Sequence, residues 1–271
     1  MVNVIEQESV CLLNLRIKPV GMADAVQMVI RAARAGSGGH VCLANSHTVG
    51  MAQSDSRLRE ASNSALLTLA DGRPLVWAAR LLGASRPCQV RGADLLWETC
   101  AAAARESIPV YFYGGAPTVT PRLVEVLSRE LPDLIVSGFE CPPFRAPTTE
   151  EDRETVDRIS SSGARILWVG LGAPKQEIWM LNHQDSLPGL VMLGVGAAFD
   201  FKGGAIPEAP PWMRTSGLEW LHRLFQDPKR LWGRYLIFNT RFAVQVGAQV
   251  VQRWMTRGRP APVNRSEGGE N

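Results

Sequence analysis

The sequence predicts an α/β fold in which helices cover both faces of a mostly parallel sheet. Short apolar runs typical of buried strands alternate with segments whose apolar residues recur at helical spacing, and glycine-rich turns connect them. The chain has 271 residues, of which 45% are hydrophobic. This is enough for one large core, or for two lobes of one α/β unit.

Six apolar runs are expected to be strands, at residues 41–44, 66–70, 109–113, 134–137, 165–169 and 190–195. Five segments have helical spacing, at residues 22–35, 75–82, 95–104, 121–131 and 150–160. This alternation is Rossmann-like, and ligands of such sheets bind at the carboxyl ends of the strands. We therefore expect the binding site at that edge.

A glycine turn at residues 170–177 follows the apolar run at 166–169 and leads into a helix that starts at Pro174. Free N–H groups at such a helix start, together with the helix dipole, favour a phosphate group. Turns of this kind also occur where the backbone only needs to bend tightly. The turn alone therefore leaves both interpretations open.

The segment 211–259 differs in composition from the rest of the chain. Nine Arg or Lys residues stand against Glu219 and Asp227, a net charge of +7, and four of the eight tryptophans lie here. Basic residues among aromatic ones at helical spacing suit an anionic membrane surface. The alternative is a helix packed on the sheet with a solvated basic face. Residues 260–271 are polar and are expected to be disordered.

Several motifs are missing from the sequence. It has no P-loop, no complete G-x-G-x-x-G fingerprint, no zinc-ligand spacing, no D-x-D and no nucleic-acid-binding motif. Five cysteines without C-x-x-C spacing indicate a reducing, cytosolic environment. No secretory signal and no membrane-spanning run is expected. Arg, Lys and backbone N–H groups would have to neutralise any bound phosphate.

Several blocks together resemble the WecG/TagA/CpsF glycosyltransferase family, in order from about residue 10 to about 240. They are Asn45 and residues 70–72, 92–95, 113–115, 170–177, 194–200 and 217–223. The resemblance implies an inverting, metal-independent transferase that needs no cofactor. It would move a hexose or N-acetylhexosamine-type sugar from a UDP-sugar to a polyprenyl-diphosphate-linked saccharide. The implied location is the cytoplasmic face of the plasma membrane, in surface polysaccharide synthesis, with no nucleic-acid partner.

By this resemblance Asp71 is the catalytic base, although an Asp-Gly turn after a strand is also common. The expected substrate-binding residues are Asn45, Gly115, Gly172, Lys175, Gln176, Gly196, Asp200, Arg214, Arg223, Arg230 and Arg234. The sequence departs from the family pattern at Leu43, where many members have Thr, and at Gln89, where many have Arg. Both departures leave the donor sugar open.

The expected organisation is an α/β catalytic domain that binds the UDP-sugar at residues 1–210. An appendage at 211–259 would associate with the membrane and the lipid carrier, and 260–271 would form the tail. Two other functions stay open, a nicotinamide-dependent oxidoreductase or epimerase and a non-catalytic nucleotide-binding membrane scaffold. The incomplete glycine fingerprint disfavours the first of these.

Overall fold

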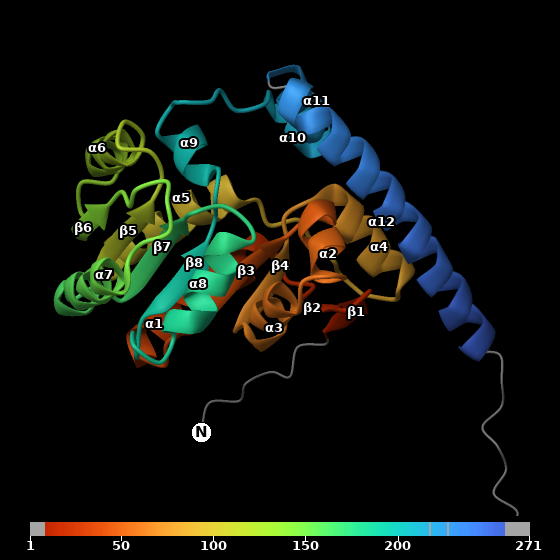
Figure 1. Cartoon of the computed structure of the whole chain (residues 1–271), viewed down its shortest axis with the longest axis horizontal. Helices are drawn as coiled ribbons and strands as arrows, with labels where there is room; N and C mark the ends of the chain where they lie inside the picture. The colour runs from red at the N-terminus through yellow and green to blue at the C-terminus, as the bar shows by residue number, and fades with distance from the viewer. Residues whose placement is uncertain (1–8, 217, 227, 258–271) are drawn as a thin grey trace, which may run out of the picture.

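A six-stranded parallel sheet forms the centre of the computed structural model (Figure 1). The structure describes residues 9–216, 218–226 and 228–257, without the side chains of residues 215, 230–232, 234–237 and 257. The strand order is β4-β3-β8-β7-β5-β6, and every neighbouring pair is parallel. The strands are β3 Gly39–Ala44, β4 Leu67–Ala70, β5 Val110–Gly114, β6 Val136–Glu140, β7 Ile166–Gly170 and β8 Val191–Gly194. The predicted fold class and all six predicted strands are confirmed.

Helices cover both faces of the sheet, as predicted, because successive strand residues point to opposite sides. One core contains Val41, Phe112 and Trp168 of the strands. Against it pack α1 Met22–Ala35, α5 Gly92–Arg105, α6 Thr120–Glu130 and α9 Ala198–Lys202. The opposite core contains Cys42 and Tyr113. It is covered by α7 Thr149–Ser161 and α8 Lys175–His183.

Four short elements before residue 65 lie outside the predicted pattern. They are the antiparallel hairpin of β1 Val10–Leu12 and β2 Leu15–Ile17, and the helices α2 Ser46–Ala52 and α3 Ser56–Ser64. Three-residue strands and one- or two-turn helices are too short to show a clear apolar period. Together with α4 Arg73–Leu81 they enclose a third apolar cluster.

The C-terminal region forms α10 Pro211–Ser216, α11 Glu219–Gln226 and the long helix α12 Pro228–Arg257. Figure 1 shows α12 beside α2. Phe238 packs on Gly50, where a Cβ would lie 2.6 Å from the Phe238 ring, and the rings of His47 and Phe238 meet edge to face. Phe242 and Val246 are buried in the third apolar cluster. The predicted C-terminal helix is present and is packed against the core.

The far half of α12 leaves apolar side chains in solvent. Val251, Trp254 and Met255 are 50%, 79% and 61% exposed. None of the helices in the described part of the chain combines the length and the apolar character needed to cross a bilayer. The predicted tail, residues 260–271, lies outside the described residues.

Candidate active site

Asp71 lies directly after β4, at the carboxyl edge of the sheet. Its backbone N–H donates to the carbonyl of Ala44 at the end of β3 over 2.8 Å. Oδ1 of its carboxyl group accepts the backbone N–H of Gly92 at 3.1 Å, and its carbonyl accepts Nε2 of Gln89 at 3.1 Å. The segment before α5 therefore crosses the end of β4 and holds Asp71 in place.

The surroundings of Asp71 favour its neutral form. Withdrawal from water and the negative charge of Glu219 raise the pKa of Asp71 to about 7. The Gly92 N–H and the positive charges of Arg223 and Arg91 act in the opposite direction. A carboxyl group with this pKa exchanges a proton readily at neutral pH, which is the property that a general base needs.

Gly92 connects Asp71 to the next part of the edge. A Cβ at Gly92 would lie 2.9 Å from Cδ1 of Leu43 and 3.4 Å from the carbonyl oxygen of Val195. A larger residue here would require the Leu43 side chain to move. Asp71 and the turn at Gly196 therefore lie on either side of one tightly packed glycine.

Gln176 and Glu177 fill the space under the β7–α8 turn. Oε1 of Gln176 accepts the Gly172 N–H at 3.1 Å, and its Nε2 donates to Oε1 of Glu177 at 2.9 Å. Both side chains are buried, and Oε2 of Glu177 has no hydrogen-bond partner among the described residues. This burial raises the pKa of Glu177 to about 7, against the opposing hydrogen bond from Gln176. A Cβ at Gly196 would lie 3.4 Å from Oε1 of Gln176, so the two glycine turns share this amide.

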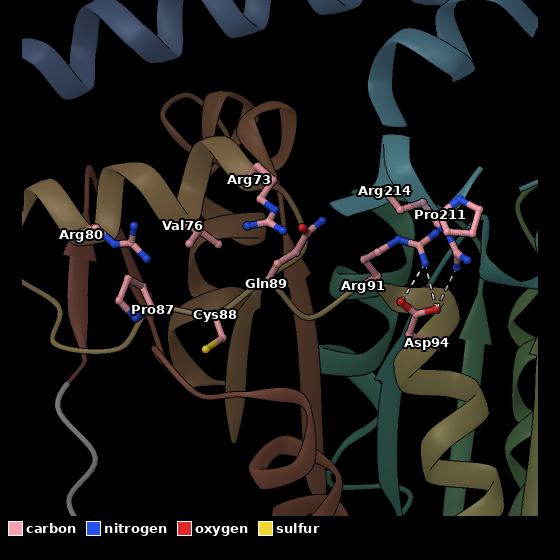
Figure 2. Close-up of a pocket in the computed structure, with 10 residues that line it drawn as sticks. All are labelled: Arg73, Val76, Arg80, Pro87, Cys88, Gln89, Arg91, Asp94, Pro211 and Arg214. Carbon is pink, nitrogen blue, oxygen red and sulfur yellow. Dashed lines mark hydrogen bonds and ion pairs between the residues drawn. The ribbon is translucent and has the colours of Figure 1, made fainter. Parts of the chain in front are cut away.

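A cavity of about 460 Å³ has Gln89 in its wall, the residue that donates to the Asp71 main-chain carbonyl. Its ten lining residues include four arginines and one acidic residue, Asp94. Figure 2 shows Arg80, Pro87 and Cys88 at one end of the cavity and Arg91, Asp94, Pro211 and Arg214 at the other, with Arg73 and Gln89 between them. The cavity can therefore hold an anionic ligand.

Arg91 joins this cavity to the C-terminal region. Its guanidinium group contacts Glu219 through Nε at 2.8 Å and Nη2 at 2.9 Å, and Asp94 through Nη1 at 2.7 Å. Glu208 lies 3.4 Å from Nη2. The Arg91 side chain is only 9% exposed, so three carboxylates surround a nearly buried cation. These contacts fix α11 against α5.

Two of the arginines that were expected to bind substrate lie near the ion pairs of Arg91. Arg214 lines the cavity and pairs with Glu208 at 3.1 Å and with Asp94 at 3.8 Å. Arg223 lies over the ring of Phe201, with its guanidinium carbon 5.2 Å from the ring centroid. The side chains of Arg230 and Arg234 lie outside the described residues.

The remaining expected binding residues have different surroundings. Asn45 caps α2, because its Oδ1 accepts the N–H groups of His47 and Thr48, both at 3.1 Å. Gly115 is needed for packing, since a Cβ there would lie 2.3 Å from Oγ1 of Thr120. In contrast, no atom lies within 4 Å of the Cβ position of Gly172, whose φ of +77° favours glycine. Lys175 is the first residue of α8, and Asp200 lies in α9.

The two departures from the family pattern both lie beside Asp71. Leu43 is 7% exposed and packs against Gly92, whose backbone N–H donates to the Asp71 carboxyl group. Gln89 contacts the Asp71 main chain and lines the cavity. Both departures from the family pattern therefore affect residues that hold Asp71 in place.

Four residues that shape this site were not predicted from the sequence, namely Arg73, Arg80, Arg91 and Glu177. Arg73 and Arg80 are seven residues apart, a spacing that places them on one helical face and that serves as a sequence signal. Arg91 and Glu177 lie next to or within matched blocks, but their partners or burial follow only from the tertiary structure. No group of three potential metal ligands occurs among the residues that the structure describes.

A comparison with known protein families identifies a match. The family model described as "Glycosyl transferase WecG/TagA/CpsF family" matches residues 10–257. The matched range contains the sheet, Asp71, the cavity and α12.

Proposed function

The chain belongs to the WecG/TagA/CpsF family of glycosyl transferases, and we propose that its donor is a UDP-sugar and its acceptor a polyprenyl-diphosphate-linked saccharide. The family membership makes it a glycosyltransferase of cell-surface polysaccharide synthesis. We further propose that a hexose or N-acetylhexosamine-type sugar is transferred with inversion and without a metal ion. The observation that carries this proposal is a carboxyl group with a pKa of about 7 at the carboxyl edge of the sheet, whose main chain is bonded to Gln89 in the wall of the arginine-lined cavity.

Asp71 acts as the general base in a single displacement. The acceptor hydroxyl oxygen attacks the anomeric carbon and forms the new glycosidic bond, while its proton passes to the Asp71 carboxylate. The bond between the anomeric carbon and the β-phosphate oxygen breaks, and its electron pair leaves with UDP. Attack from the face opposite UDP inverts the configuration. The hydrogen bond from Gly92 supports this role because it orients the carboxyl group.

The donor diphosphate lies at the glycine turns of β7 and β8. The open space at Gly172 and its closeness to Gly196 support this placement, since both turns leave room for a ligand near the backbone. The amide of Gln176 holds the two turns together. Arg214 and Arg223 supply positive charge for the departing UDP, the role that a divalent ion has in other transferases.

The C-terminal helix associates with the cytoplasmic membrane surface. Its exposed Val251, Trp254 and Met255 and its exposed Arg253 support this placement, because apolar and basic groups together favour an anionic bilayer surface. Membrane binding would bring the enzyme to its lipid-linked acceptor.

A donor and acceptor screen tests the proposed function. UDP-sugars are offered with a short-chain polyprenyl-diphosphate saccharide, with and without chelator, and UDP and NAD binding are measured in parallel. We expect transfer from one or more UDP-sugars that chelator does not change, and saturable binding of UDP. Saturable binding of NAD without binding of UDP would contradict the proposal, and chelator sensitivity would contradict the metal-free mechanism.

A further inference from the structure

The two ends of the cavity differ in the balance of charge. At one end, Arg91 and Arg214 are already paired with Asp94, Glu208 and Glu219. Arg80 lies at the other end and Arg73 between the two ends, and Asp94 is the only acidic residue among the ten that line the cavity. Arg80 is exposed and makes no ion pair with any described residue. An incoming anion therefore meets less competition from carboxylates at Arg80.

Helix α4 presents these arginines beside exposed apolar side chains. Arg73, Val76 and Arg80 share the cavity face of the helix, because they are three, four and seven residues apart. At 3.6 residues per turn, Trp77 and Leu81 are rotated by about 40° and 80° from Arg73 around the helix axis. They are 53% and 67% exposed. A basic row and an apolar row thus run side by side along α4.

We propose that Arg73 and Arg80 bind the diphosphate of the prenyl-linked acceptor, and that Trp77 and Leu81 contact the first part of its hydrocarbon chain. This inference rests on the proposed function and assigns its acceptor subsite. Guanidinium groups form charge-assisted hydrogen bonds with phosphate oxygens, and a diphosphate offers oxygens to both arginines. The apolar row gives the lipid a surface of its own next to the charged group.

The position of Arg73 and Arg80 favours the acceptor over the donor. They belong to the helix that follows β4, at the edge of the sheet, whereas the turns at Gly172 and Gly196 follow β7 and β8 on the other side of β3. Gln89 links the cavity to Asp71, since it lines the cavity beside Arg73 (Figure 2) and donates to the Asp71 main-chain carbonyl. A saccharide bound through its diphosphate at α4 can therefore extend toward Asp71, while UDP leaves from the opposite side.

Binding of geranyl diphosphate to the full-length protein tests this subsite without turnover. Titration calorimetry is carried out at saturating UDP, on the wild type and on Arg80→Gln. The matched control is Arg105→Gln, because Arg105 is also an exposed arginine in the last turn of a helix. We expect Arg80→Gln to weaken geranyl diphosphate binding about ten- to a hundredfold, the effect of losing a charge-assisted hydrogen bond. Arg105→Gln should leave it unchanged, and both variants should bind UDP like the wild type.

A second comparison separates a lipid diphosphate from a free one. Inorganic diphosphate is titrated beside geranyl diphosphate, on the wild type and on Leu81→Ser. We expect geranyl diphosphate to bind more tightly, and Leu81→Ser to weaken only this ligand. Equal affinities for the two ligands would instead identify a site for free diphosphate and overturn the lipid assignment.

Two other results would overturn the subsite itself. One is unchanged geranyl diphosphate binding in Arg80→Gln, and the other is a loss of UDP binding in that variant, which would assign the arginines to the donor. The same variants separate this inference from the proposed function. Normal transfer to a lipid-linked acceptor by Arg80→Gln contradicts only the subsite, whereas no transfer by the wild type contradicts the transferase itself.

Discussion

The backbone N–H of Gly92 donates to the carboxyl group of Asp71 over 3.1 Å, although the two residues are 21 positions apart. The same glycine packs closely against Leu43 and Val195, since a Cβ there would lie 2.9 Å from Cδ1 of Leu43 and 3.4 Å from the Val195 carbonyl oxygen. Asp71 is thus oriented by one hydrogen bond and placed next to apolar surface. These two effects act on its pKa in opposite directions, and the withdrawal from water dominates.

The pKa of Asp71 predicts how transfer depends on pH. The proposed base must be deprotonated, and its pKa is raised to about 7. We therefore expect kcat/KM to rise about tenfold per pH unit below this value and to level off above it. Initial rates between about pH 5.5 and 9 at low acceptor concentration measure the profile. A rate that is constant from pH 5.5 upward would contradict Asp71 as the titrating base.

Glu177 predicts the pH dependence of stability. Its pKa is raised to about 7 in the folded protein and is near 4.3 when unfolded. Between these values the folded state binds more protons than the unfolded state, so this group lowers the stability as the pH rises. We expect Glu177→Gln to reduce the fall in melting temperature between pH 5 and pH 8. An equally steep fall in this variant would contradict the assignment.

The ion pairs of Arg91 are expected to stabilise the packing of the C-terminal region. Replacement by Ala leaves Glu219, Asp94 and Glu208 near one another without their shared cation. We expect a loss of about 3–5 kcal/mol in unfolding free energy, the usual effect of removing one partner from a buried ion pair. Denaturant unfolding measures it. The control, Arg129→Ala, removes an exposed pair with Glu130 and should change little. Equal unfolding free energies of the two variants would show that the ion pairs of Arg91 do not fix α11 in place.

The exposed end of α12 predicts membrane binding. We expect Trp254→Ser together with Met255→Ser to reduce flotation with anionic vesicles severalfold, because both residues are exposed on the proposed membrane face. Phe144→Ser is the control, since Phe144 is 85% exposed on another part of the molecule. These substitutions are more informative than deletion from residue 211, which would also remove the partner of Arg91 and the buried Phe242. Flotation that neither variant changes would place the membrane surface elsewhere.

The sheet was predictable from the sequence because buried parallel strands read as continuous apolar runs. The predicted runs at 41–44 and 166–169 coincide closely with β3 and β7. The hairpin of β1 and β2 has only three residues in each strand, so its apolar pattern was too short to detect. The local sequence pattern thus predicts the long strands and helices, but not the short ones.

The edge of the sheet that carries the site was also predictable, since the carboxyl ends of parallel strands lie on one side. The contacts between residues at that edge could not be predicted from the sequence. Arg91 and Glu219 are 128 residues apart, and no local signal pairs them. Likewise, the role of Asn45 as the cap of α2 depends on a short helix that the sequence pattern does not reveal. Long-range packing supplies this information.

Replacing Asp71 by Asn tests the central claim most directly, because the amide keeps the size of the side chain but cannot accept the proton. Transfer and UDP binding are measured on the same preparation. We expect transfer to fall about a hundred- to ten-thousandfold, while the UDP dissociation constant stays within about twofold of the wild type, a change below about 0.5 kcal/mol. Transfer at the wild-type rate in this variant would contradict the account.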